Sequence, residues 1–544
     1  MVTISCPHRA REWCFLGWVS VRVESDVRIA RSRALGLAGS ALLAVATTAT
    51  GALPVRDPFQ DVPVISQLRS ASWLAMGLTF LGLTLLVGAW LRLGAVLRED
   101  AAARRPRTPV QEMTTTMVWW TAPLLLVPPL YSRDIYSYLV QGTMFAENID
   151  PYRIPPVVYG ADNISEVWQH STAPYGPVFL ALAAVVSLLA KYGVIGGILL
   201  MRLVNVGALV VIAYCMVPLA RRYGIDPARA LWLGLLNPLV LAHVVGGVHN
   251  DVMMIALMLA GLLMAQRDRP VLGALLVGLA VLVKAPAGLA LVFMVPAAAR
   301  WLTARGLSGS TNPLARRALV RGAALMGVVG AGTIAAVTAA ADSGYGWIAG
   351  MGDTVKVYNG LSVATDVGRL YDWMASQLGV TPPLNLITTA RLVGLMAAGV
   401  VVLVLLRRMR GRPVLGVGLG LGVVVLAGPV IHPWYLLWAI VPIAAATRNE
   451  RLIKVVAVLS VAMMYYPMPS GGGPTGDVAV GVVGAVVGVI WLRRNPLPGI
   501  TPAPSLLDSV RGARRAVRGW WERMGTPEQA EPPLDVRRPE PARR

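Results

Sequence analysis

The sequence has few charged residues, few cysteines and almost no lysine. Charged side chains make up 14% of its 544 residues, whereas 56% are hydrophobic. A soluble protein of this length cannot cover so much apolar surface, so a soluble globular fold is excluded. Cys6, Cys14 and Cys215 form no spaced pair or metal-ligand pattern, which excludes a disulfide framework and a zinc site. Arg outnumbers Lys 45 to 4, so the position of each Lys is informative.

Long hydrophobic stretches recur along nearly the whole chain, and each is long enough to cross about 30 Å of hydrocarbon. We therefore predict an all-α, polytopic membrane protein with about 14 transmembrane helices and two long extracytoplasmic loops, 132–173 and 342–386. The predicted helices lie near 34–54, 73–93, 114–131, 197–219, 230–245, 251–266, 270–284, 286–302, 318–341, 387–406, 413–431, 433–447, 452–467 and 477–492.

Positive charge is concentrated in alternate loops, and it predicts the orientation of the helices. The basic clusters fall at 9–33, 92–107, 221–229, 267–269, 300–321, 407–412 and 448–454. Basic loops stay on the cytoplasmic side, so both termini are predicted to be cytoplasmic. The predicted location of the protein is the plasma (inner) membrane. The net charge of +21 is explained by these loops. The expected partner is therefore the lipid bilayer and no nucleic acid is predicted.

Three regions follow from these patterns. Residues 1–33 form a cytoplasmic N-terminal segment, 34–494 the membrane domain, and 495–544 a Pro- and Arg-rich cytoplasmic tail that is mostly disordered. If the apolar segment 174–190 spanned the membrane, two crossings would separate the outer loop 132–173 from the basic cluster 221–229. Both would then lie on the same side, against the charge pattern. We interpret it as a re-entrant or interfacial helix, and a hidden third crossing nearby is the alternative.

Unusual polar residues gather on the predicted outer face. Ionisable groups at membrane depth are costly, so they are functional candidates. Arg and Lys would hold the oxygens of a lipid phosphate, and a carboxylate would accept a proton from an attacking hydroxyl. No Walker or Rossmann motif occurs, which argues against a soluble nucleotide donor. The candidates are Arg133, Asp134, Tyr136, Arg202, His249, Asp251, Lys284 and His432.

Five stretches of the sequence carry a resemblance to a known family. They are PPLYSRDIYSYLVQG, TAPYGPVFLAL, NPLVLAHVVGGVHNDVMM, VLVKAPAGL and HPWYLLWAIVPIAA, in this order between about 115 and 450. Together they resemble the actinobacterial polyprenol-phosphomannose-dependent α-1,6-mannosyltransferases, which are C-type (GT-C) membrane glycosyltransferases. The first 30 residues and the chain after 494 carry no such likeness.

The resemblance implies a GT-C-like fold with its active site on the extracytoplasmic face and a key carboxylate in the first outer loop, here Asp134. It implies polyprenyl-phosphate-mannose as donor and a mannosylated phosphatidylinositol-type glycolipid as acceptor. The product would be the α-1,6-mannan core of lipomannan and lipoarabinomannan. A β-linked donor and an α-linked product require inversion in one displacement, which needs a base and no covalent nucleophile.

Some C-type families carry two adjacent acidic residues in this loop, often with a divalent metal. Here Arg133 precedes Asp134 and Ile135 follows it, so we predict no metal ligands, no cofactor and no metal requirement. Asp134 is the predicted base. Lys284, supported by Arg133 or Arg202, is the predicted phosphate ligand, and His249, Asp251, His432 and Tyr136 line the site. The alternatives are an arabinofuranose or glucose donor, or a membrane lipid or solute transporter.

Overall fold

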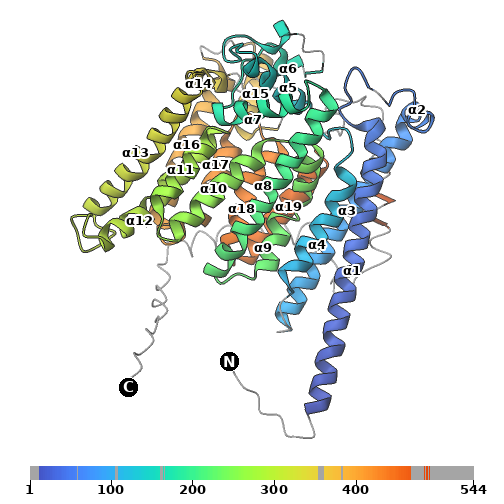
Figure 1. Ribbon diagram of the computed structural model, residues 1–544, viewed down its shortest axis with the longest axis horizontal. Helices are drawn as coiled ribbons and strands as arrows, with labels where there is room; N and C mark the ends of the chain where they lie inside the picture. Colours follow the sequence, from blue (N-terminus) through green and yellow to red (C-terminus); the bar gives the residue numbers. More distant parts are fainter. Residues whose placement is uncertain are drawn as a thin grey trace. The chain divides into compact units, whose positions relative to one another are not determined.

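The computed structural model describes residues 11–57, 59–103, 108–159, 163–164, 166–352, 361–380 and 384–466, with a few isolated positions between 483 and 490. All of them belong to one compact unit, residues 1–495. This part of the chain is helical and contains no strand (Figure 1), which confirms the predicted all-α class. The predicted tail and, apart from the isolated positions, the segment 477–492 lie outside the described residues.

The N-terminal part of the unit is a group of long helices, α1 (Arg11–Thr50), α3 (Ser72–Ala102) and α4 (Val110–Thr121), with the short α2 (Pro63–Ser70) between the first two. α1 packs along α3 and α4 (Figure 1). α1 and α3 approach closely where Gly39 faces Gly82, because a Cβ on either would lie 2.8 Å from facing backbone. α1 also runs through residue 33, so the predicted domain boundary falls inside a helix.

Both predicted outer loops contain helices, which gather at one end of the bundle (Figure 1). The first loop holds α5 (Asp134–Ala146) and the short helices η2 (Pro156–Tyr159) and α6 (Glu166–Gln169), and the second holds α14 (Gly346–Gly350) and α15 (Val363–Gln377). The segment predicted to be re-entrant is α7 (Pro177–Leu189), which packs against α5. Its 13 residues extend about 20 Å, too short for a membrane crossing.

The core of the unit is made by α8 (Val194–Arg222), α9 (Pro227–Gly234), α10 (Asp251–Gln266), α11 (Pro270–Val281), α12 (Leu289–Ala304), α17 (Pro413–Ala427), α18 (Leu436–Ala446) and α19 (Glu450–Met464). Several begin with proline in the first turn, where its missing N–H costs nothing. Asn449 caps α19 by accepting from the N–H groups of Arg451 and Leu452.

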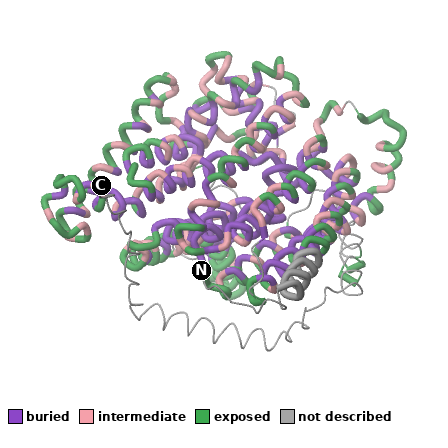
Figure 2. The backbone as a smooth tube through the Cα atoms, turned by 60° about the horizontal axis from the view of Figure 1, so that its bottom comes forward, coloured by how far each residue is buried: buried purple, intermediate pink, exposed green. Residues whose placement is uncertain are grey.

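Two long apolar helices, α13 (Arg316–Ala340) and α16 (Leu386–Arg408), bury only a few of their side chains. Figure 2 shows buried residues concentrated in the interior of the bundle and exposed ones around it. The exposed side chains include Val328, Leu392, Leu395 and Leu403. A surface of this kind is stable where lipid surrounds it.

Within the described residues, six helices are long and apolar enough to cross a membrane, and four more are apolar but shorter. The six correspond to the predicted spans at 34–54, 73–93, 197–219, 286–302, 318–341 and 387–406. The protein is therefore a helical membrane protein, and the total of 14 crossings stays a prediction.

The predicted span 230–245 is interrupted. α9 ends at Gly234, and a separate π-helix, η3 (Val240–Gly246), follows it. η3 is bent by 111° from α10, across residues 247–250. Val248 in this break has a φ of 59°, a strained value for a β-branched residue. Short π-helices and breaks at membrane depth frequently mark functional sites.

Candidate active site

Asp134 is the first residue of α5, after a sharp turn of the chain. The turn places Tyr131 at a φ of 68°, and the Tyr131 hydroxyl donates a hydrogen bond to the Met464 carbonyl. The N–H of Asp134 donates to the Ser132 hydroxyl. The Asp134 side chain is 16% exposed. A carboxylate in the first turn of a helix is stabilised by the free backbone N–H groups there, so the fold holds an accessible anion at this point.

His249, from the break between η3 and α10, lies next to this carboxylate. Its Nδ1 is 3.5 Å from Asp134 Oδ2, and the imidazole is fully buried. Burial by itself would raise the pKa of Asp134, but the contact with His249 outweighs it and lowers that pKa to about 2. Asp134 is therefore ionised at neutral pH, as a proton acceptor must be.

Trp434 joins two of the predicted histidines. It is in the short helix η6 (Pro433–Tyr435), and its ring stacks on His249 at 3.6 Å and on His432 at 4.4 Å. Burial lowers the pKa of His432 to about 4; the carboxylates of Asp134 and Asp251 oppose this, and the charge of Lys284 adds to it. The imidazole of His432 is thus neutral at pH 7 and lies within electrostatic range of Asp134, Asp251 and Lys284.

Lys284 forms an ion pair with Asp251. Lys284 Nζ lies 2.8 Å from Asp251 Oδ1, which also accepts a 2.6 Å hydrogen bond from Trp438 Nε1. The Asp251 side chain is completely buried, whereas that of Lys284 is 13% exposed. The ammonium group also lies 4.7 Å from the centre of the Tyr435 ring. An ammonium has three donors, so Lys284 can bind a phosphate oxygen while it neutralises Asp251.

Arg202 is placed differently from its prediction as a phosphate ligand. It is 2% exposed, and its guanidinium donates to three carbonyl oxygens, those of Leu125, Val245 and Gly246, at 2.9–3.1 Å. Two of these carbonyls belong to the C-terminal end of η3. Arg202 therefore supports the helix break that carries His249 and does not itself face the cluster.

We expect Arg202→Met to lower the free energy of unfolding by about 3 kcal/mol or more, because three buried carbonyls lose their donor and each costs about 1–3 kcal/mol. The thermal unfolding midpoint in detergent is the measurement. Arg221→Met, at the exposed end of the same helix, is the matched control. An Arg202→Met midpoint equal to that of the control would contradict this structural role.

Arg133 and Tyr136 lie beside Asp134 in sequence but point to other partners. Arg133 Nη1 donates to the Asn163 carbonyl at 3.1 Å, and its guanidinium carbon lies 6.0 Å from the centre of the Tyr136 ring. The buried Tyr136 hydroxyl donates to the Ala52 carbonyl at 2.6 Å. The structure thus brings Asp134, His249, His432, Lys284 and Asp251 together, and it leaves Arg133, Tyr136 and Arg202 at the edge of the cluster.

Several aromatic residues of the cluster were missed by the sequence analysis, namely Tyr138, Tyr175, Trp434, Tyr435 and Trp438. Tyr175 and Tyr138 meet edge to face at 5.4 Å, and Lys284 Nζ lies 5.9 Å from the Tyr175 ring centre. The stretches TAPYGP and HPWYLLW contain most of these rings. Aromatic rings at these positions suit stacking on sugar faces.

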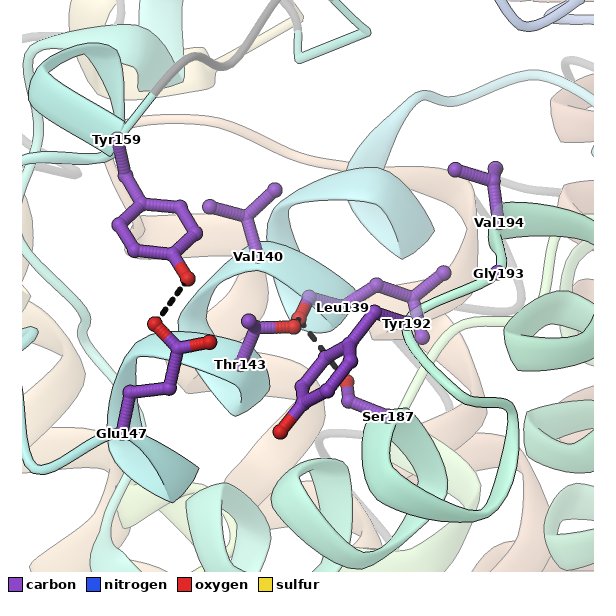
Figure 3. A pocket seen from close by; sticks show the side chains of 9 residues that line it. All are labelled: Leu139, Val140, Thr143, Glu147, Tyr159, Ser187, Tyr192, Gly193 and Val194. Atoms are coloured by element: carbon purple, nitrogen blue, oxygen red, sulfur yellow. Dashed lines mark hydrogen bonds between the residues drawn. The ribbon is translucent and has the colours of Figure 1, made fainter.

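A separate cavity of about 410 Å³ lies on the far side of α5. It is lined by Thr143, Ser187 and Tyr192 among others, and the Glu147 carboxylate there accepts a hydrogen bond from the Tyr159 hydroxyl (Figure 3). Residues 139, 143 and 147 are roughly half a turn around the helix from Asp134, at about 100° per residue. Glu147 therefore does not belong to the cluster around Asp134.

Among the residues that the structure describes, no group of three or more His, Cys, Asp and Glu side chains is arranged to hold a metal ion. His249 and Asp134 lie side by side, and their neighbours are the aromatic Trp434 and the hydroxyl of Ser132. The predicted independence from metal stays a prediction, which a chelator tests.

Comparison with known proteins agrees with the resemblance seen in the sequence. The family described as "Alpha-(1->6)-mannopyranosyltransferase, N-terminal domain" matches residues 33–300, and the "MptB C-terminal domain" matches residues 364–494. No solved structure gives a significant match.

Curated proteins match over most of their length. Alpha-(1->6)-mannopyranosyltransferase A of Mycobacterium tuberculosis is 33% identical over 445 residues, 80% of this chain and 84% of that protein. Alpha-(1->6)-mannopyranosyltransferase B of Corynebacterium glutamicum is 31% identical over 513 residues, 87% of this chain and 84% of that protein. The chain belongs to the α-(1→6)-mannopyranosyltransferase family and is a glycosyltransferase.

Proposed function

We propose that this protein transfers mannose from polyprenyl-phosphate-mannose to a lipid-anchored α-1,6-mannan on the extracytoplasmic face of the plasma membrane. The single observation that supports this most is the cluster at the helix break, where an accessible, ionised Asp134 and a partly exposed Lys284 both lie within electrostatic range of His432. One base and one phosphate-binding cation are what an inverting displacement of a phosphate requires. The acceptor would be a mannosylated phosphatidylinositol-type glycolipid, and the product a lipomannan or lipoarabinomannan core.

In this mechanism an acceptor hydroxyl attacks the anomeric carbon of the donor mannose while Asp134 takes its proton. The bond between that carbon and the phosphate oxygen breaks, and its electron pair leaves with the polyprenyl phosphate. Lys284 stabilises the negative charge that develops there. With a pKa of about 2, Asp134 is a weak base. It therefore accepts the proton late, once the new C–O bond has made the hydroxyl strongly acidic.

The experiment that tests the proposal uses purified protein in nanodiscs with a short α-1,6-mannose acceptor. Polyprenyl phosphates carrying mannose, arabinofuranose or glucose are supplied one at a time. We expect product from the mannose donor, with the same yield in excess chelator. A product from another donor alone would overturn the choice of sugar. No glycosidic product from any donor, together with movement of substrate across the bilayer of proteoliposomes, would overturn the reaction and favour a transporter.

The contact between His249 and Asp134 makes a prediction about pH. In His249→Gln the group that lowers the Asp134 pKa is gone and burial remains, so the pKa of Asp134 rises. The ionised carboxylate is then lost at a higher pH, and the acid limb of kcat moves upward. Transfer rates measured between pH 4 and 7 test this. The wild-type rate should stay constant at pH values where the rate of the variant already falls. Coincident acid limbs would contradict the assignment of His249.

A further inference from the structure

A second cavity, of about 510 Å³, lies at the end of the bundle opposite the cluster. It is formed by α12, the start of α13 and the end of α16. Lys284 lies between the end of α11 and the start of α12. From there α12 runs away from the cluster and α13 runs back, so the start of α13 lies far from the Asp134 end (Figure 1). Its lining is apolar, with Val292, Leu314 and Val320 among the apolar residues, and it includes the three arginines Arg316, Arg407 and Arg410.

The three arginines are exposed, and each lacks a hydrogen bond or ion pair within the part of the chain that the structure describes. The sequence has no Asp or Glu from 269 to 341 or from 373 to 449, so α12, α13, α16 and α17 carry none. Asp268, before α11, acts on Arg300. The cavity therefore carries positive charge that the surrounding helices do not neutralise, and an anion fits it.

The apolar walls of the cavity indicate which kind of anion it binds. Val292, Leu314 and Val320 are 45%, 46% and 59% exposed, and a small hydrated anion would not cover them. A phospholipid satisfies both parts of the cavity, because its acyl chain covers the apolar wall and its phosphate pairs with guanidinium groups. Basic pockets between transmembrane helices are known to bind anionic headgroups.

We propose that this cavity binds one phospholipid with an anionic headgroup. The headgroup sits among Arg316, Arg407 and Arg410, and one acyl chain runs along the exposed face of α13. This site is independent of the chemistry at Asp134, since it lies at the other end of the bundle. A diffuse attraction between basic loops and an anionic membrane surface is the competing explanation.

Native mass spectrometry of the full-length protein in detergent tests the proposal, with dioleoylphosphatidylglycerol as the probe and dioleoylphosphatidylcholine as the neutral comparison. We expect one phosphatidylglycerol to be retained at least 10-fold more strongly than phosphatidylcholine. Arg316→Gln/Arg407→Gln/Arg410→Gln should lose this difference. The matched control is the triple variant Arg221→Gln/Arg267→Gln/Arg269→Gln, which removes the same charge from exposed positions at the same end.

Ala323→Trp separates the two parts of the site, because it fills the apolar wall without changing the charge. We expect it to weaken phosphatidylglycerol retention several-fold while the thermal midpoint stays near that of wild type. Equal loss from both triple variants would support diffuse attraction and overturn the site. Retention unchanged in the Arg316/Arg407/Arg410 variant, or equal for the two lipids, would also overturn it.

Discussion

Asp134→Asn is expected to lower the rate of mannosyl transfer about 10³-fold, within the range that general-base catalysis contributes. An asparagine keeps the size and the hydrogen bond to Ser132 but cannot take up the proton of the acceptor hydroxyl. Because the carboxylate is partly exposed and close to a single imidazole, its neutral replacement should leave the thermal midpoint within a few degrees of wild type. Initial rates with purified protein and polyprenyl-phosphate-mannose measure the effect.

Asp372→Asn is the matched control, since Asp372 is an exposed carboxylate on α15, at the same end of the bundle. It should keep the wild-type rate. A folded Asp134→Asn protein that retains more than about a tenth of the wild-type rate would remove Asp134 as the base. The buried Asp251 would not replace it readily, because its carboxylate is held by Lys284 and Trp438.

The second large effect is expected at the Lys284–Asp251 pair, where structure and function can be separated. Lys284→Met leaves the Asp251 carboxylate buried without its cation, which costs about 3–5 kcal/mol. The double variant Lys284→Met/Asp251→Asn removes both charges and keeps an oxygen that accepts from Trp438. We therefore expect the single variant to be strongly destabilised and the double variant to regain most of the lost stability.

The double variant should regain stability but not the rate of mannosyl transfer, because the phosphate of the donor still lacks its cation. Thermal midpoints and initial rates of wild type, both single variants and the double variant form the full cycle. Recovery of the wild-type rate together with stability would show that Lys284 only neutralises Asp251. A Lys284→Met protein with an unchanged midpoint would show that the buried ion pair contributes little.

The sequence predicted the fold class and much of the cluster, because both rest on strong local signals. Long apolar stretches predict helices, and six of them match long apolar helices of the structure. Asp134, His249, Lys284 and His432 were chosen as rare ionisable groups on one predicted face. That choice needs only the alternation of loops, which local sequence supplies.

The partners of each side chain depend on packing between distant helices and could not be predicted. His249 reaches Asp134 across 115 residues of sequence because a π-helix ends and the chain bends by 111°. A turn between the spans 230–245 and 251–266 was predicted, but no residue pattern indicated the π-helix before it or the angle. Arg202 resembles a phosphate ligand in sequence, yet three carbonyls at this bend take up its donors. Trp434 lies between two histidines, a contact that only the folded chain reveals.

The stereochemistry of a single transfer tests the central claim most directly. Purified protein is given the β-linked mannosyl phosphate donor and a defined α-1,6-mannose acceptor, and the new linkage is determined by NMR. The account predicts an α-linked product, formed in one displacement with Asp134 as the base. A β-linked product, or a mannosyl group covalently trapped on Asp134, would contradict it.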